Sequence, residues 1–269
     1  MMPQGRREIK GLLEAHGVRP TKKLGQNFLA DPNLVDRIVR TARIGPGDRV
    51  FEVGSGTGAL TRALAATGAK VLSYETDRRL EPILADTLSG STVDLRFEDV
   101  MRSDLGEVLG NGPWTMVANL PYNIGTPLVL DVLRHIPVVT RFVVMVQREV
   151  ADRLLAAPGN RTYGVPSVVV TLHADARLAF TVPPDVFFPM PEVESAVIEM
   201  TRIETPPCAE EAIELAAAAF QQRRKMLRRS LDDVIADPIS ALTAAGIAET
   251  ARPEDIPAAD YVRLAEGLA

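Results

Sequence analysis

The chain has 269 residues, of which 46% are hydrophobic and 24% are charged, and its formal net charge at pH 7 is -5, as in a globular protein with one large domain or two unequal ones. Its single cysteine, Cys208, excludes an internal disulfide framework, and its three histidines lack metal-ligand spacing, so no metal is implied. No signal-peptide core and no run of about 18 apolar residues is present, so we expect a cytoplasmic protein without a membrane segment.

Short apolar segments alternate with helical patterns over the first 156 residues. Strands are predicted at 49–53, 71–75, 93–97, 115–118 and 142–146, and helices at 59–66, 78–88, 126–135 and 149–156. This alternation predicts an α/β domain with a doubly wound, mostly parallel sheet.

The pattern changes after residue 156. Segments 165–174 and 193–201 are predicted strands of an antiparallel pair that closes the sheet, because the prolines between them exclude a full helix. Pro206-Pro207 then breaks the chain, and apolar residues recur at helical spacing from Ala209 onward. We therefore expect a first domain at 1–204 and a small helical domain at 205–269.

Charge is distributed unevenly along the chain. Residues 1–43 carry nine Lys/Arg against four Asp/Glu, and residues 221–229 carry five basic residues and no acid. Residues 230–269 carry eight acids against two arginines. Two basic segments on an acidic protein can guide a polyanion locally, although a basic cluster is also compatible with a solvated helix face.

Three consecutive strand ends carry residues suited to a nucleoside. Gly54, Gly56 and Gly58 follow the first predicted strand, where a backbone without Cβ atoms can approach a ligand, and their Gly-x-Gly-x-Gly spacing differs from the dinucleotide fingerprint. Glu75 ends the second strand, where a carboxylate can accept both hydroxyls of a ribose. Asp99 ends the third and can accept an adenine amine, although each acid is equally suited to cap a helix.

The fourth strand ends at Asn119-Leu120-Pro121-Tyr122. The Asn119 side-chain oxygen and the Leu120 carbonyl can accept the two hydrogens of an exocyclic amine, and the Tyr122 ring can stack on the base. Alone, the motif is also found in ordinary turns. Because it comes after three strand ends that suit a nucleoside, the motif indicates a reaction at the exocyclic amine of a base.

This order of motifs resembles class I methyltransferases that use S-adenosylmethionine, and its details are similar to the ribosomal RNA adenine dimethyltransferase family. The resemblance covers nearly the whole chain and rests on Lys22-Lys23-Leu24-Gly25-Gln26-Asn27-Phe28-Leu29, the glycine loop, Asn119 to Ile124, Val146 to Ala151, Pro158-Gly159, Tyr163-Gly164, Val182-Pro183-Pro184, Phe187, Pro189, Pro191, Ser195 to Val197 and Phe220 to Arg228. It implies a Rossmann-like catalytic domain followed by an RNA-contacting helical domain.

The resemblance also implies roles for individual residues. Asn27 and Leu29 would close over S-adenosylmethionine, which the glycine loop, Glu75, Asp99 and Asn119 would bind. Tyr122 and Phe187 would flank the target base, although core packing is the ordinary role for Phe187. The residues expected to contact RNA are Arg223, Arg224, Lys225 and Arg228, on an expected helix at 222–225. The implied substrate is a pair of adjacent adenosines in the 3′-terminal hairpin loop of small-subunit rRNA within an immature 30S particle, modified by a monomeric enzyme.

The sequence departs from the family pattern in a few places. Ser55 and Thr57 replace the usual proline and leucine, so a looser glycine loop is expected. Glu192 stands where a lysine is typical and would repel a nearby phosphate.

Three alternatives remain open from the sequence. One is a related methyltransferase of the macrolide-resistance type that modifies large-subunit rRNA, and the second is a ribosome-assembly factor whose binding outweighs methylation. The third is a DNA or small-molecule amine methyltransferase, which would leave the basic helical domain unexplained.

Overall fold

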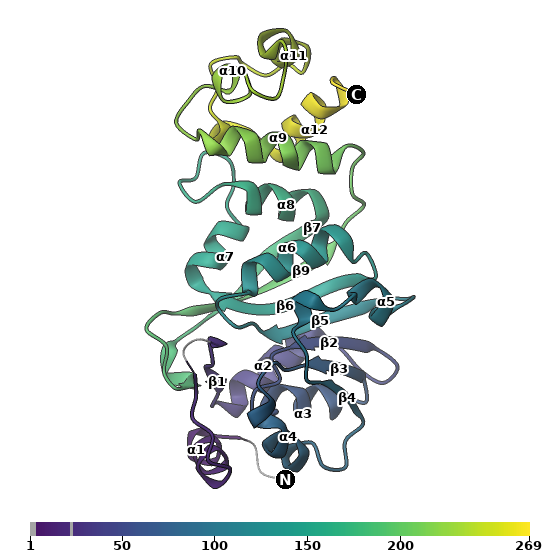
Figure 1. Cartoon of the computed structure of the whole chain (residues 1–269), viewed down its shortest axis with the longest axis vertical. Helices are drawn as coiled ribbons and strands as arrows, with labels where there is room; N and C mark the ends of the chain where they lie inside the picture. Colours follow the sequence, from purple (N-terminus) through teal and green to yellow (C-terminus); the bar gives the residue numbers. More distant parts are fainter. Residues whose placement is uncertain (1–3, 22–23) are drawn as a thin grey trace. The chain divides into compact units, whose positions relative to one another are not determined.

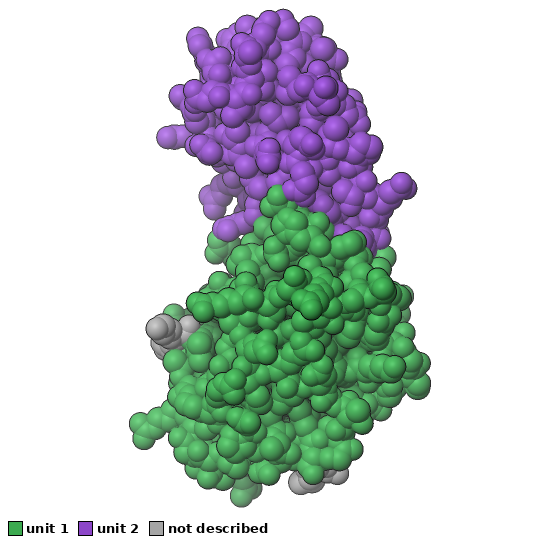
Figure 2. Space-filling model, turned by 45° about the vertical axis from the view of Figure 1, so that its right-hand side comes forward, with its two compact units in different colours: residues 1–151, 177–201 green, residues 152–176, 202–269 purple. Residues whose placement is uncertain are grey.

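The computed structural model describes residues 4–21 and 24–269 (Figure 1). Lys22 and Lys23 of the N-terminal motif lie outside the described residues. The chain divides into two compact units, unit 1 with residues 1–151 and 177–201, and unit 2 with residues 152–176 and 202–269 (Figure 2). Segment 152–176 therefore groups with the C-terminal helices, whereas the sequence assigned it to the first domain.

A seven-stranded sheet forms the centre of unit 1, in the order β4-β3-β2-β5-β6-β9-β7. Its first five strands pair in parallel, and β9 pairs antiparallel with β6. This order confirms the predicted α/β fold class. The strands are β2 (Arg49–Val53), β3 (Lys70–Tyr74), β4 (Val93–Arg96), β5 (Trp114–Asn119), β6 (Val139–Gln147), β7 (Ala174–Val182) and β9 (Ser195–Arg202).

Helices connect the parallel strands. Because such crossovers are right-handed, α3 and α4 cover one face of the sheet and α5 and α6 cover the other (Figure 1). The helical segments up to the end of the parallel sheet are α1 (Arg6–Ala15), α2 (Pro32–Ala42), α3 (Ala59–Ala65), η2 (Arg78–Leu80), α4 (Glu81–Thr87), η3 (Val100–Arg102), α5 (Leu105–Leu109), α6 (Gly125–His135) and α7 (Arg148–Leu154).

Helix α2 shows how the sequence sets local structure. The Asp31 side chain caps it by accepting from Asn33 N, and Pro32 occupies the first turn, where a missing N–H costs nothing. Apolar residues at helical spacing, including Leu34 and Ile38, are buried against the sheet in the core cluster that also contains Val117 and Val143. The helix therefore begins beside Leu29 and runs along the sheet.

A second, two-stranded sheet joins distant parts of unit 1. Strand β1 (Phe28–Leu29) pairs antiparallel with β8 (Phe187–Phe188), which follows η4 (Pro184–Val186). Phe28 also packs with Ile9 and Leu13 of α1 and with Leu84 of α4 in a separate core cluster. The N-terminal segment is thereby fixed to the loop that precedes β9.

The predicted strand over 165–174 is wrong, because this segment forms helix α8 (Val165–His173). Its β-branched residues are buried on several sides, so the apolar run resembles a strand, but Pro166 fits the first turn of a helix. The closing strand is β7, which follows directly and lies beside β9. The prediction at 193–201 is confirmed by β9.

Unit 2 is helical within the described residues. Besides α8 it contains α9 (Ala209–Gln221), α10 (Leu227–Ser230), α11 (Pro238–Ala244), η5 (Pro253–Asp255) and α12 (Ala258–Glu266). No described helix is long and apolar enough to cross a membrane. In the same ranges, no three His, Cys, Asp or Glu residues gather where they could hold a metal ion.

Candidate active site

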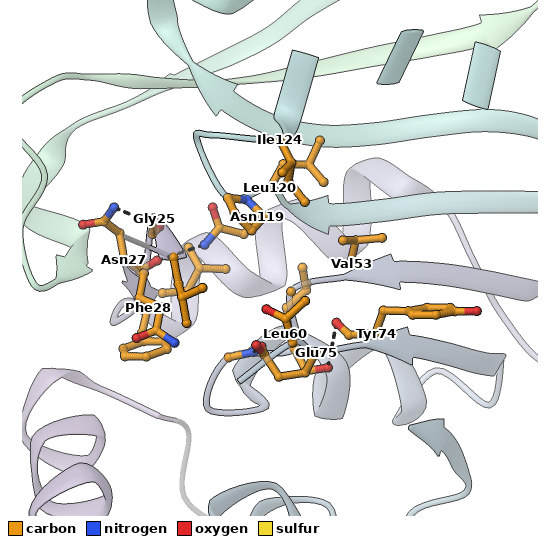
Figure 3. Close-up of a pocket in the computed structure, with 18 of the residues that line it drawn as sticks. Gly25, Asn27, Phe28, Val53, Leu60, Tyr74, Glu75, Asn119, Leu120 and Ile124 are labelled. Atoms are coloured by element: carbon orange, nitrogen blue, oxygen red, sulfur yellow. Dashed lines mark hydrogen bonds between the residues drawn. The ribbon is translucent and has the colours of Figure 1, made fainter. Parts of the chain in front are cut away.

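A cavity lies at the carboxyl ends of β2, β3 and β5 in unit 1, where open α/β sheets bind ligands (Figure 3). Its walls come from residues 24–29, 53–57, 74–76 and 119–122, together with Ala59, Leu60, Glu98, Val100 and Ile124. Segments from four predicted motifs thus meet at one cavity. The predicted residues Asn27, Leu29, Gly54, Gly56, Glu75 and Asn119 to Tyr122 all line it.

The three glycines of the loop have different roles. Gly54 and Gly56 line the cavity with positive φ angles of 86° and 57°, a region that favours glycine. A Cβ on Gly54 would lie 3.4 Å from Pro121 Cδ, so this glycine lets the loop approach the Asn119 to Tyr122 segment. Gly58 does not line the cavity, and a Cβ there would lie 2.9 Å from Thr87 Cγ2. The structure therefore places Gly58 in the packing of the loop against α4.

Hydrogen bonds from outside the glycine loop hold Ser55 and Thr57. Ser55 Oγ lies 2.7 Å from Ser73 Oγ of β3. The Thr57 hydroxyl donates to Gln4 Oε1 at 2.7 Å, and Gln4 Nε2 donates to the Thr57 carbonyl at 2.9 Å. The two residues that depart from the family pattern are thereby tied to β3 and to the N-terminal segment.

Glu75 is oriented by the backbone on both sides of its carboxylate. Oε2 accepts from Gly56 N and Oε1 accepts from Asp77 N, each at 2.9 Å. Burial raises the pKa of Glu75, and the two N–H donors oppose that shift. Each carboxylate oxygen has a further lone pair, so Glu75 can still accept hydroxyl groups from the cavity.

Asp99 is placed differently from the prediction. Its Oδ1 accepts from Met101 N at 3.1 Å and caps η3, and its Oδ2 lies 3.5 Å from Arg102 Nε. The cavity wall at this strand end consists of Glu98 and Val100, without Asp99. Helix capping, the ordinary role for an acid after a strand, is thus realised here.

Asn119 is held in one orientation by the N-terminal motif. Its Nδ2 donates to the main-chain oxygen of Asn27 at 3.0 Å (Figure 3). Because a carbonyl only accepts hydrogen bonds, the amide nitrogen must face Asn27 and Oδ1 must point elsewhere. Neither Asn119 Oδ1 nor the Leu120 carbonyl accepts a hydrogen bond from any described residue. Asn119 and Leu120, two consecutive residues that line the cavity, therefore each keep an acceptor without a partner among the described residues.

The two predicted aromatic residues lie in different surroundings. Tyr122 lines the cavity, and its hydroxyl lies 2.8 Å from the buried Ser195 Oγ of β9. Burial raises the pKa of Tyr122, so its hydroxyl stays protonated at neutral pH. Phe187 is 0% exposed in the core and pairs with Leu29. The structure places Phe187 behind the cavity wall, as a support for Leu29.

The basic residues predicted to contact RNA lie in unit 2. Arg223, Arg224 and Lys225 follow α9 on a turn rather than on the expected helix, and Arg228 lies in α10. Arg223 Nε donates to Glu254 Oε2 at 2.7 Å, and Arg228 lies 3.3 Å from a Glu249 carboxylate oxygen. Arg224 and Lys225 are exposed and have no carboxylate partner among the described residues. Two of these four basic residues, Arg223 and Arg228, are therefore paired with acids of the C-terminal segment.

Sequence reasoning assigned no role to two residues of this region, Phe28 and Ser195. A Cβ on Gly56 would lie 3.0 Å from Phe28 Cδ1, so the Phe28 ring covers the glycine loop. Both residues belong to segments that carry the family resemblance, which was the only signal in the sequence for them.

The doubly wound sheet with its cavity at the carboxyl ends of the parallel strands defines a class I methyltransferase fold. The model of the family described as ribosomal RNA adenine dimethylase matches residues 18–269. The chain belongs to this family of rRNA adenine dimethyltransferases.

Individual relatives agree with this assignment. The proteins named ribosomal RNA small subunit methyltransferase A from Kineococcus radiotolerans and Leifsonia xyli are 43% and 44% identical to the chain. The matches cover 96% and 97% of this chain, and 89% and 97% of the relatives.

Two solved structures share the fold. A dimethyladenosine transferase from Plasmodium falciparum has a TM-score of 0.76 at 23% identity and covers 88% of this chain and 95% of its own. The 23S rRNA methyltransferase ErmE has a TM-score of 0.70 at 26% identity, with coverage of 90% and 99%.

Proposed function

We propose that this protein transfers methyl groups from S-adenosylmethionine to the N6 amines of two adjacent adenosines in the 3′-terminal hairpin loop of small-subunit rRNA. It would act as a cytoplasmic monomer on an immature 30S particle and contribute to ribosome biogenesis. The observation that carries the proposal is that Asn119, Leu120 and Tyr122 line one cavity, while Asn119 Oδ1 and the Leu120 carbonyl have no hydrogen-bond partner among the described residues.

The residues that line the cavity suit S-adenosylmethionine by their chemistry. Gly54 and Gly56 leave a backbone cradle that a Cβ would narrow, and the buried Glu75 carboxylate can accept the ribose hydroxyls. Asp99 caps η3 through Oδ1 and lies beside Arg102 through Oδ2, so it would reach the adenine amine only through a remaining lone pair. When bound, S-adenosylmethionine supplies a methyl group on a positively charged sulfur, which is already electrophilic.

The protein's own residues solve a problem of orientation. The lone pair of an adenine amine is delocalised into the ring, so the nitrogen is a weak nucleophile. Asn119 Oδ1 and the Leu120 carbonyl accept the two amine hydrogens and draw them out of the ring plane, which returns the lone pair to nitrogen. Tyr122 stacks on the base and contributes roughly 1 to 3 kcal/mol to holding it outside its own stack.

No strong general base is needed. The methylated amine is a strong acid while it carries its extra proton, and it can release this proton to water. An acceptor pair that tolerates one methyl group then permits a second transfer to the same nitrogen.

The test is methylation of unmethylated small subunits, naked small-subunit rRNA and large subunits by the full-length protein with a labelled methyl donor, followed by mapping of the label. We expect label on two adjacent adenosines of the 3′-terminal hairpin loop. Label confined to large-subunit rRNA would instead support the branch represented by ErmE. Small subunits that are bound but never labelled would contradict the proposal and favour a pure assembly factor.

A further inference from the structure

Unit 1 carries a second concave surface, lined by four arginines. Three of them, Arg37, Arg40 and Arg43, lie on α2 and at its C-terminal end, and the fourth, Arg177, lies on β7. We call these four residues the arginine surface. Its remaining walls include Phe180 and Glu199.

The positive charge of the arginine surface is largely uncompensated. The side chains of Arg37, Arg40 and Arg43 have no hydrogen bond or carboxylate partner among residues 4–21 and 24–269. Only Arg177 is paired, with Glu199, which Arg141 also approaches at 3.9 Å. Three free guanidinium groups on a protein with a net charge of -5 mark a site for an anionic partner.

Arg37 is already oriented for such a partner. Its guanidinium carbon lies 3.7 Å from the centre of the Phe180 ring. Stacking fixes the plane of the guanidinium and leaves the N–H groups at its edge free, so less entropy is lost when a phosphate binds bidentately.

Arg43 occupies a backbone position that favours glycine. It caps the C-terminus of α2 with a φ of 50°, in the left-handed region. Glycine would adopt this conformation without strain but would remove a guanidinium from the arginine surface. Replacement by glycine therefore separates the contribution of the side chain from that of the fold.

Both elements of the arginine surface also lead to the candidate active site. Helix α2 begins just after Leu29 on the cavity wall, and its 11 residues at about 1.5 Å each place its C-terminus roughly 16 Å from that wall. Strand β7 is followed by η4 and by Phe187 of β8, which pairs with Leu29 on the same wall. An extended polyanion can therefore contact the arginine surface while one of its bases occupies the cavity.

We infer that the arginine surface docks the phosphate backbone of rRNA outside the target loop. The inference rests on the proposed function, since it assigns a second contact to the same substrate. Several separate cations on an open surface fit the repeated phosphates of an RNA strand better than one small anion.

The test is binding of the full-length protein to naked small-subunit rRNA and to unmethylated small subunits over a range of salt concentrations. The variant carries Arg37→Ala, Arg40→Ala and Arg43→Gly. We expect the slope of log K against log salt to become shallower by about 1 for each arginine removed, and the affinity at physiological salt to fall on the order of tenfold or more.

The matched control is Arg263→Ala on α12, which removes an exposed arginine paired with Asp260. The salt slope and rRNA affinity of this variant should equal those of the wild type.

Arg43→Gly alone should weaken rRNA binding while its melting temperature stays equal or rises, which excludes loss of fold as the cause. Unchanged slopes in the triple variant would overturn the inference. A loss of affinity for small subunits without any loss of affinity for naked rRNA would also overturn the inference, because it would indicate a protein partner. Failure of the wild type to methylate small subunits would instead overturn the proposed function.

Discussion

The side-chain nitrogen of Asn119 lies 3.0 Å from the main-chain oxygen of Asn27, 92 positions away in the sequence. This contact assigns a physical role to the N-terminal motif: it fixes the Asn119 amide so that its oxygen has no partner among the described residues. The cavity wall at residues 24–29 therefore orients the Asn119 side chain as well as enclosing the cavity.

Substitution of Asn119 should separate catalysis from cofactor binding. Asn119→Ala removes the acceptor and should lower kcat by about 100-fold to 1000-fold, as loss of a transition-state hydrogen bond does. Asn119→Asp should lower kcat to a similar extent, because a carboxylate cannot donate a hydrogen bond to the Asn27 carbonyl. Methyl-transfer kinetics and calorimetric titration with S-adenosylmethionine measure the two properties. Full activity in Asn119→Ala would contradict the assignment.

The Tyr122–Ser195 hydrogen bond should orient the stacking ring. Tyr122→Phe and Ser195→Ala each remove this bond, so each should lower kcat/KM about fivefold, and the double variant should lose no more than either single one. Tyr122→Ala removes the ring as well and should lose a further ~1 to 3 kcal/mol. Additive losses in the double variant would show that the two residues act independently.

Gly58 and Gly90 form a matched pair for stability. Both have positive φ, 84° and 77°, but a Cβ on Gly58 would lie 2.9 Å from Thr87 whereas a Cβ on Gly90 meets nothing within 4 Å. Gly90→Ala should cost about 1 kcal/mol of unfolding free energy for backbone strain alone. Gly58→Ala should cost about 1 to 3 kcal/mol more because of the clash. Equal costs in urea denaturation would contradict a packing role for Gly58.

Glu52 should make stability depend on pH. It is fully buried in β2, where burial raises its pKa to about 7 against the donating Ser73 hydroxyl. The folded state thus holds a proton that the unfolded state loses near pH 4.5. The extra unfolding free energy that protonated Glu52 contributes is complete below that pH and is lost as pH rises to about 7. The total contribution is on the order of 3 kcal/mol.

Urea denaturation of the wild type and Glu52→Gln between pH 4.5 and 8 measures this effect. The neutral glutamine should remove most of the decline in unfolding free energy across that range. Some decline should persist, because burial also raises the pKa of Glu75. An identical pH profile in the two proteins would show that Glu52 does not change its protonation on folding.

The basic turn of unit 2 should divide into structural and RNA-binding residues. Arg223→Ala breaks the hydrogen bonds to Glu254 and the Asn160 carbonyl and should cost ~1 kcal/mol of unfolding free energy. The double variant Arg224→Ala, Lys225→Ala should leave the unfolding free energy unchanged but weaken rRNA binding. The slope of log K against log salt should become shallower by about 2. Full rRNA affinity in that double variant would remove the turn from the RNA contact.

The sequence predicted the parallel sheet well because its alternation of short apolar strands with helical patterns is a local signal. It failed at α8, where Val165, Val168, Val169 and Val170 make an apolar run that periodicity alone cannot assign to strand or helix. Pro166, which suits the first turn of a helix, was the available signal.

The candidate site was predictable to the same extent. Strand ends of a parallel sheet meet at one edge, so Gly54, Glu75 and Asn119 could be brought together from their order alone. The Asn27 contact with Asn119 depends on how the N-terminal segment crosses the cavity, which no spacing encodes. The buried position of Phe187 likewise follows from its pairing with Leu29, a tertiary contact.

The pairing of β1 with β8 has a consequence for biosynthesis. Phe28 and Phe188 are partners although 160 positions (188 − 28) separate them. Closing so long a loop is entropically costly, and it cannot begin until the ribosome has synthesised the chain past Phe188. A nascent chain can therefore fold its parallel sheet first, and its candidate active-site cavity acquires the N-terminal wall only after Phe188 has been synthesised.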